Sequence, residues 1–341
     1  MLAPPAYKPV SRWVTYWLIL IAVMIAAMVV VGGATRLTGS GLSITEWNPI
    51  MGAIPPLADA DWQAAFAKYQ QSSQYRLQNT GMTIDQFKFI FWWEWAHRLL
   101  GRMIGVVFFL PFVIFAALKM LPRRIWGRLI TIFILGGLQG ALGWYMVASG
   151  LVDRVSVSQY RLSAHLTFAA IILAFVLWVV FSLTRAHHRP KGGMQWLALL
   201  LVPLVLLQIA AGGFVAGLDA GQGYNTWPLM DGAFVPAGLG ALQPWWANLF
   251  ENALTVQFDH RMLAYVVFAL VMVQVAGIRT SPALLLAVFV LFQVALGITT
   301  LLSHVPLDLA LLHQLGAIAV LAAAVWNLSA ATSVPAIHRD Q

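Results

Sequence analysis

Eight stretches of this sequence are each long and apolar enough to cross a lipid bilayer. A transmembrane helix needs about 20 predominantly apolar residues. Stretches near that length cover residues 13–33, 89–118, 125–148, 159–184, 195–217, 255–278, 282–303 and 307–330. Because backbone groups in lipid must be satisfied within helices or closed barrels, the sequence predicts an all-α integral membrane protein with eight transmembrane helices.

Composition agrees with a chain that is dissolved mainly in lipid. Hydrophobic residues make up 60% of the 341 residues and charged residues only 9%, against about 25% charged residues in a soluble domain. Soluble enzyme folds are therefore excluded. The chain has no Cys, which removes disulfides, iron–sulfur clusters, thiolate metal sites and cysteine nucleophiles. Any bound metal must be held by His.

The net charge of +8 indicates membrane orientation rather than nucleic-acid binding, because Lys and Arg gather in the cytoplasmic segments of membrane proteins. The basic residues of the N-terminus, the even-to-odd connections and the C-terminus are Lys8, Arg12, Lys119, Arg123, Arg124, Arg128, Arg185, Arg189, Lys191, Arg279 and Arg339. This distribution predicts cytoplasmic termini and two long outer loops, between spans 1 and 2 and between spans 5 and 6. A bacterial inner membrane, with periplasmic loops, or its mitochondrial equivalent fits.

The second half of the chain repeats the first. The matched features are Gly32-Gly33 with Gly212-Gly213, His97-Arg98 with His260-Arg261, residues 139–143 with residues 293–297, and His165 with His313. Each half has an even number of spans, so the two halves keep the same orientation and are related by an axis along the membrane normal. We expect two pseudo-symmetric four-helix bundles, in domains 1–190 and 191–341.

Four of the eight His lie inside spans, one on each even-numbered span, at a similar depth below the outer surface. They are His97, His165, His260 and His313. Two His per bundle is the geometry of bis-imidazole heme ligation, which bundles build from facing helices. The alternative is that each His only forms hydrogen bonds between helices. The matched depth and the repeat favour heme or metal.

Charged residues accompany these His. Arg98, Arg102 and Arg261 lie beside these His and Arg36 lies at the end of the first span, where they either bind heme propionates or extend to the interface. Glu94 lies three residues before His97 and so shares its helix face, whereas the second half has Gln257 there. A carboxylate in low dielectric suits proton transfer; the alternative is an ion pair with Arg98. The halves therefore resemble one catalytic site and one cofactor site.

Two segments resemble the heme A synthase family. Residues 32–44 follow its GG-x-TRLT-x-SGLSI pattern, and residues 87–102 follow its FK-x-I-x-x-x-E-x-x-HR-x-x-GR pattern. The resemblance runs through all eight spans. It implies an enzyme that oxidises the C8 methyl of heme O to a formyl by successive hydroxylations, with water as oxygen source, giving heme A for cytochrome oxidase assembly.

The resemblance also implies roles for individual residues. His260 and His313 would ligate a resident heme b in the C-terminal half, and His97 and His165 would engage substrate heme O in the N-terminal half. Glu94 matches the essential carboxylate of the family. Some relatives carry a cysteine pair in an outer loop, so this chain resembles the Cys-free branch of proteobacteria and mitochondria. Implied partners are heme O synthase, which is a protoheme farnesyltransferase, and oxidase assembly factors. Self-association into a homo-oligomer stays open.

Two other functions use the same features. A di-heme cytochrome that carries electrons from quinol would need the four His but gives no reason for a carboxylate at one site only. A transporter would explain the repeat but would place broken helices and polar groups near the midplane, whereas the ionisable residues here lie toward the outer side.

Overall fold

The computed structural model describes residues 10–48, 51–151, 154–184 and 195–332. Eight helices in these ranges are long and apolar enough to cross a membrane. They are α1 (Arg12–Leu37), α4 (Ile84–Ala117), α5 (Arg123–Ala148), α6 (Gln159–Thr184), α7 (Gln195–Gly217), α9 (Ala253–Gly277), α10 (Ser281–Leu302) and α11 (Leu307–Thr332). The predicted spans are confirmed. Several basic residues that predicted the orientation, Arg185 and Arg339 among them, lie outside the described residues.

Short elements lie in the two long loops. They are η1 (Met51–Ala53), α2 (Asp59–Tyr69) and α3 (Ser73–Leu77) between α1 and α4, and η2 (Trp245–Ala247) and α8 (Asn248–Glu251) between α7 and α9. In the described ranges extended pairing is limited to one isolated bridge, from Met230 to Ala233. The fold is therefore all-α, as predicted.

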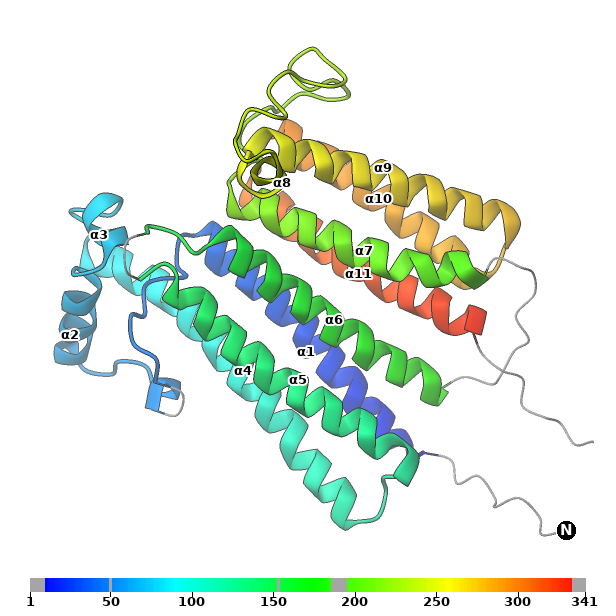
Figure 1. Cartoon of the computed structure of the whole chain (residues 1–341). Helices are drawn as coiled ribbons and strands as arrows, with labels where there is room; N and C mark the ends of the chain where they lie inside the picture. The colour runs from blue at the N-terminus through cyan, green and yellow to red at the C-terminus, as the bar shows by residue number, and fades with distance from the viewer. Residues whose placement is uncertain (1–9, 49–50, 152–153, 185–194, 333–341) are drawn as a thin grey trace, which may run out of the picture.

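The long helices form two groups of four (Figure 1). Helices α1, α4, α5 and α6 make the first group, and α7, α9, α10 and α11 make the second. Figure 1 shows α2, α3 and the α7–α9 connection at the same end of the helices, while the α4–α5 and α9–α10 connections lie at the other end. The two long loops therefore share one side, as an even number of spans per half requires.

Helices α1 and α6 of the first group pack against α7 and α11 of the second. The core of each group includes a residue from the other: Ile318 of α11 joins the first core, and Ala170 of α6 joins the second. Polar contacts add to this packing, since Ser163 donates to the carbonyl of Ala210 at 2.8 Å and Gln314 donates to that of Val29 at 2.8 Å. The two halves thus share one continuous interface.

Helix α4 begins five residues before the predicted span, and a capping box explains this start. The Thr83 side chain accepts from the Gln86 amide nitrogen at 3.3 Å, and the Gln86 side chain accepts from the Thr83 nitrogen at 2.9 Å. Such reciprocal bonds satisfy the free donors of a first helical turn. The first turns of α4 therefore extend beyond the apolar stretch, where an aromatic cluster of α2 covers Phe87, Ile90 and Phe91.

Candidate functional site

The four intramembrane His occupy equivalent places, one on each of α4, α6, α9 and α11. Each imidazole faces a glycine on the preceding long helix of its own bundle. The pairs are His97 with Gly32, His165 with Gly143, His260 with Gly212, and His313 with Gly297. A Cβ on these glycines would lie 3.1, 2.9, 3.2 and 2.8 Å, respectively, from the ring. Any larger residue would therefore displace the imidazole.

The four His also associate in two pairs. His97 interacts electrostatically with His165, and His260 interacts electrostatically with His313. Each pair joins two helices of a single bundle, α4 with α6 and α9 with α11. The structure therefore brings together two His per bundle, the pairing expected from the repeat.

Glutamine amides hold three of the four His. The Gln139 amide nitrogen lies 3.2 Å from His165 Nδ1 and donates to the His165 carbonyl at 3.0 Å. Gln208 makes the same contacts to His260, at 3.1 and 3.0 Å, and Gln293 donates to the His313 carbonyl at 2.8 Å. The repeat in the sequence included Gln139 and Gln293 but did not indicate a role for these two side chains.

The surroundings of the His fit a heme group. His313 Nδ1 and the side-chain oxygens of Gln139, Gln208 and Gln293 are buried and have no hydrogen-bond partner. The glycines let each imidazole lie directly against the backbone of the neighbouring helix. Heme iron takes its axial ligands from His in many proteins, so two His per bundle suffice. Within the described ranges, no group of three or more His, Asp or Glu could hold a metal ion.

Glu94 is 2% exposed and accepts hydrogen bonds at both carboxylate oxygens. Ser43 Oγ and the Ile44 amide nitrogen donate to Oε2 at 2.7 and 2.8 Å. Arg98 donates to Oε1 from Nη2 at 2.6 Å and from Nε at 3.1 Å. The ion pair weighed as an alternative is therefore present, and it fixes the carboxylate one helical turn from His97.

Arg98 also holds the loop between α1 and α4 over this site. Its guanidinium donates to the carbonyls of Ile44 at 2.8 Å and Glu46 at 2.9 Å. The Glu46 side chain turns away to the solvent side, where the hydrogen bond from Lys68, at 2.7 Å, holds the pKa of the Glu46 carboxyl below its usual range. The segment that closes the outer end of the N-terminal bundle is thus anchored from α4.

The second half repeats this anchor without the carboxylate. Arg261 donates to the carbonyls of Tyr224 at 2.8 Å and Thr226 at 2.9 Å, and to the Gln257 side-chain oxygen at 2.7 Å. The Gln257 amide nitrogen donates to the carbonyls of Ala220 and Gly223, at 2.6 and 2.9 Å. An amide thus replaces the carboxylate at the equivalent place.

The two remaining arginines lie in different surroundings. Arg102 donates to the carbonyl of Asn48 at 2.9 Å, so it too contacts the first outer loop. Arg36 joins the halves: it pairs with Asp219 at 2.8 Å and donates to the carbonyl of Ala216. The sequence placed Arg36 at a helix end but did not reveal its partner in the other half.

Known proteins resemble this chain over most of its length. The COX15-CtaA family, described as cytochrome oxidase assembly protein, matches residues 15–325. A heme A synthase of Azorhizobium caulinodans is 56% identical over 96% of this chain and 96% of its own length. Heme A synthases of Mesorhizobium japonicum (53% identical; 91% of this chain and 89% of the relative) and Parvibaculum lavamentivorans (49%; 92% and 93%) are also similar.

Proposed function

Because the chain belongs to the COX15-CtaA family and is a heme A synthase, we propose that it oxidises the C8 methyl of heme O to a formyl group. The enzyme is an oxidoreductase that spans the membrane several times. The observation that carries the proposal is a difference in charge between the two sites: a buried carboxylate, Glu94, stands where the other half has the neutral Gln257. A pure electron carrier would not need that difference.

The two halves would bind different hemes. In residues 191–341, His260 and His313 would hold a resident heme b through their imidazoles. In residues 1–190, His97 and His165 would hold the substrate heme O. The glycines that face the imidazoles and the buried glutamine oxygens without a hydrogen-bond partner support both assignments.

Glu94 acts as the proton acceptor. Each hydroxylation breaks a C–H bond of the C8 methyl group, forms a C–O bond with the oxygen of water, and releases protons and electrons in equal number. The electrons pass to an acceptor outside the chain, and loss of water from the doubly hydroxylated carbon leaves the formyl group. Glu94 takes a proton at a carboxylate oxygen, while Ser43 and Ile44 hold that oxygen in place. General base catalysis of this kind contributes about 10²–10⁴-fold to a rate. Resident heme b, when bound, supplies a path for electrons away from the substrate.

The arginines beside the His and Arg36 at the end of α1 would meet the propionates. A guanidinium forms bidentate pairs with carboxylates, and Arg98, Arg102 and Arg261 lie where the outer loops close over the His. Arg36 would have to exchange Asp219 for a propionate. In this arrangement the propionates of both hemes would lie toward the side of the two long loops.

Orientation and partners follow the charge distribution and the family. We place the enzyme in a bacterial inner membrane with both termini cytoplasmic and the α1–α4 and α7–α9 loops periplasmic. Heme O synthase would supply the substrate, and oxidase assembly factors would receive heme A.

Expression in a host that makes heme O but no heme A, followed by pigment extraction, tests the proposal. The wild-type enzyme should produce heme A. Glu94→Gln should stop production, because an amide cannot accept the proton, while heme b absorbance persists. Glu46→Gln is the matched control, since this nearby carboxylate is exposed and pairs with Lys68, and it should keep normal production. Heme A formed at the normal rate by Glu94→Gln would show that the assigned role is wrong.

A further inference from the structure

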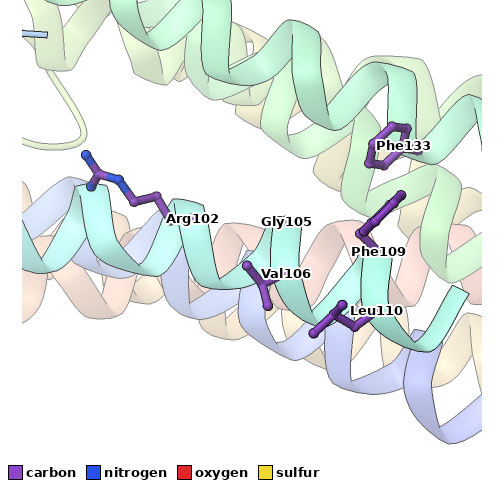
Figure 2. A pocket seen from close by; sticks show the side chains of 6 residues that line it. All are labelled: Arg102, Gly105, Val106, Phe109, Leu110 and Phe133. Carbon is purple, nitrogen blue, oxygen red and sulfur yellow. The ribbon is translucent and has the colours of Figure 1, made fainter. Parts of the chain in front are cut away.

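A groove of about 410 Å³ lies between α4 and α5 in the N-terminal half. This volume falls within the range of about 300–1,000 Å³ that is typical of small-molecule sites. Figure 2 shows its lining residues: Arg102, Gly105, Val106, Phe109, Leu110 and Phe133. Arg102 is the single charged group among them, so the walls are otherwise apolar.

The groove runs inward from the level of the His. Gly105 follows His97 by eight residues, which is about 12 Å along the helix. Arg102 lies at the outer end, where it contacts the first loop through the Asn48 carbonyl. At the inner end the rings of Phe109 and Phe133 approach to 5.7 Å between centroids and face each other across the two helices (Figure 2). The groove is thus polar at its outer end and closed by aromatic rings at its inner end.

The C-terminal half fills the equivalent space on α9. Alignment of His97 with His260 places Gly105 opposite Phe268. Phe268 packs against the core of the second bundle, whereas a Cβ on Gly105 would meet nothing within 4 Å. A large ring in one half thus corresponds to open space in the other.

Helices α5 and α10 differ in the same way, with glycine in the N-terminal half and a larger residue in the C-terminal half. Alignment of Gln139 with Gln293 pairs Gly136 with Val290 and Gly140 with Val294. Val290 is 4% exposed, and Val294 packs against the same core. A Cβ on either α5 glycine would meet nothing within 4 Å. Both α4 and α5 therefore carry glycines where the C-terminal half has larger side chains, and of these glycines Gly105 lines the groove.

We propose that this groove holds the isoprenoid side chain of heme O. The inference rests on the proposed function, in which the N-terminal half binds heme O and the C-terminal half binds heme b. Heme O carries a long apolar chain that heme b lacks, and the half assigned to heme O has open space at Gly105 where the other half has the packed ring of Phe268. With the propionates at the outer surface, the chain on the opposite edge of the macrocycle points inward, along the groove.

The groove orients the substrate more than it attracts it. The isoprenoid chain is already in an apolar medium when it lies in lipid, so its transfer into the groove gains little hydrophobic free energy. A macrocycle held only by two axial His could rotate about the axis through its iron. A chain held between α4 and α5 prevents that rotation and keeps one methyl group toward Glu94.

Gly105→Phe tests the proposal, because it places in the groove the residue type that the C-terminal half has at the equivalent position. The new side chain enters open space, so the fold is kept. Purified protein with its resident heme is titrated with heme O and, separately, with heme b, and the added low-spin absorbance is followed. We expect heme O binding to weaken about tenfold or more, with a matching loss of heme A formation, and heme b binding to stay unchanged. Val106→Phe, on the same wall, should behave alike.

Gly127→Phe is the matched control, because this α5 glycine is exposed, has open space at its Cβ and does not line the groove. Wild-type affinity for heme O in both groove variants would mean that the groove holds only lipid and would overturn the proposal. Equal weakening of heme O and heme b would overturn it too, since the block would then act on the macrocycle. A wild-type protein that binds neither heme at a second site would instead contradict the proposed function itself.

Discussion

Arg98 and Arg261 make matching contacts, but only Arg98 meets a carboxylate. Each donates to two carbonyls of the outer loop in its own half and to the side chain one turn earlier. Arg98 is 13% exposed and Glu94 2% exposed. Removal of one partner from a buried ion pair leaves a charge without compensation and costs about 3–5 kcal/mol. The two arginines should therefore differ in their importance for stability.

Arg98→Leu should lower the free energy of unfolding by about 3–5 kcal/mol, because Glu94 would remain buried without its cation. Arg261→Leu removes three hydrogen bonds, against four for Arg98→Leu, beside a neutral amide and should cost less. Thermal denaturation of both purified variants in detergent measures the difference. Equal destabilisation would show that loop anchoring, and not the ion pair, determines the cost.

Local spacing predicted the residues that form these sites but not their long-range contacts. The position of Glu94 three residues before His97 and four before Arg98 follows from helical periodicity. The donors Ser43 and Ile44 come from a loop about fifty residues away in sequence, so no local pattern could reveal them. The glycine opposite each His was visible only as part of a repeat, because its partner lies on another helix.

Helices α6 and α7 approach closely where the two halves meet. A Cβ on Gly213 would lie 2.8 Å from the Ser163 Cα, and one on Gly217 would lie 2.7 Å from the Gln159 Cα. Backbone atoms, unlike side chains, cannot avoid such a close contact by a change of rotamer. These two glycines therefore set the distance between the halves, as small residues do in many membrane helix pairs.

Gly213→Ala should destabilise the protein by about 1–3 kcal/mol, the usual cost of overpacking. Gly137→Ala makes the same change on α5, where a Cβ meets nothing within 4 Å. This control should be neutral or slightly stabilising, because Ala favours a helix over Gly by about 1 kcal/mol. Unfolding temperatures compare the two variants, and a stabilising Gly213→Ala would contradict the close approach of α6 and α7.

Hydropathy predicted the eight helices well because lipid imposes their length and composition. It predicted their ends less well, since caps such as Thr83 and Gln86 act outside the hydrocarbon. The groove between α4 and α5 was not predicted. Its glycines resemble the small residues common in membrane helices, and only comparison of the packed halves shows that Val and Phe fill the same space elsewhere.

The whole molecule consists of two similar bundles with unlike sites. Both keep two His, their glycine neighbours and an arginine anchor. The N-terminal bundle alone, within the described residues, combines a buried carboxylate with a groove between its second and third long helices. The repeat in sequence predicted the shared architecture, whereas the exchange of Glu94 for Gln257 predicted the division of roles. Our account therefore assigns the substrate to one half and the resident cofactor to the other.

The most direct test of this division compares His313→Ala with His165→Ala, each purified from a host that makes heme O but has no other source of heme A. Extracted pigments and low-spin absorbance are recorded for both. We expect His313→Ala to lose heme b, because its axial ligand is gone, and His165→Ala to keep heme b while forming no heme A. His304→Asn, at an outer helix end, serves as control and should keep both pigments. Loss of the same heme from both variants, or retention of heme b by His313→Ala, would contradict the account.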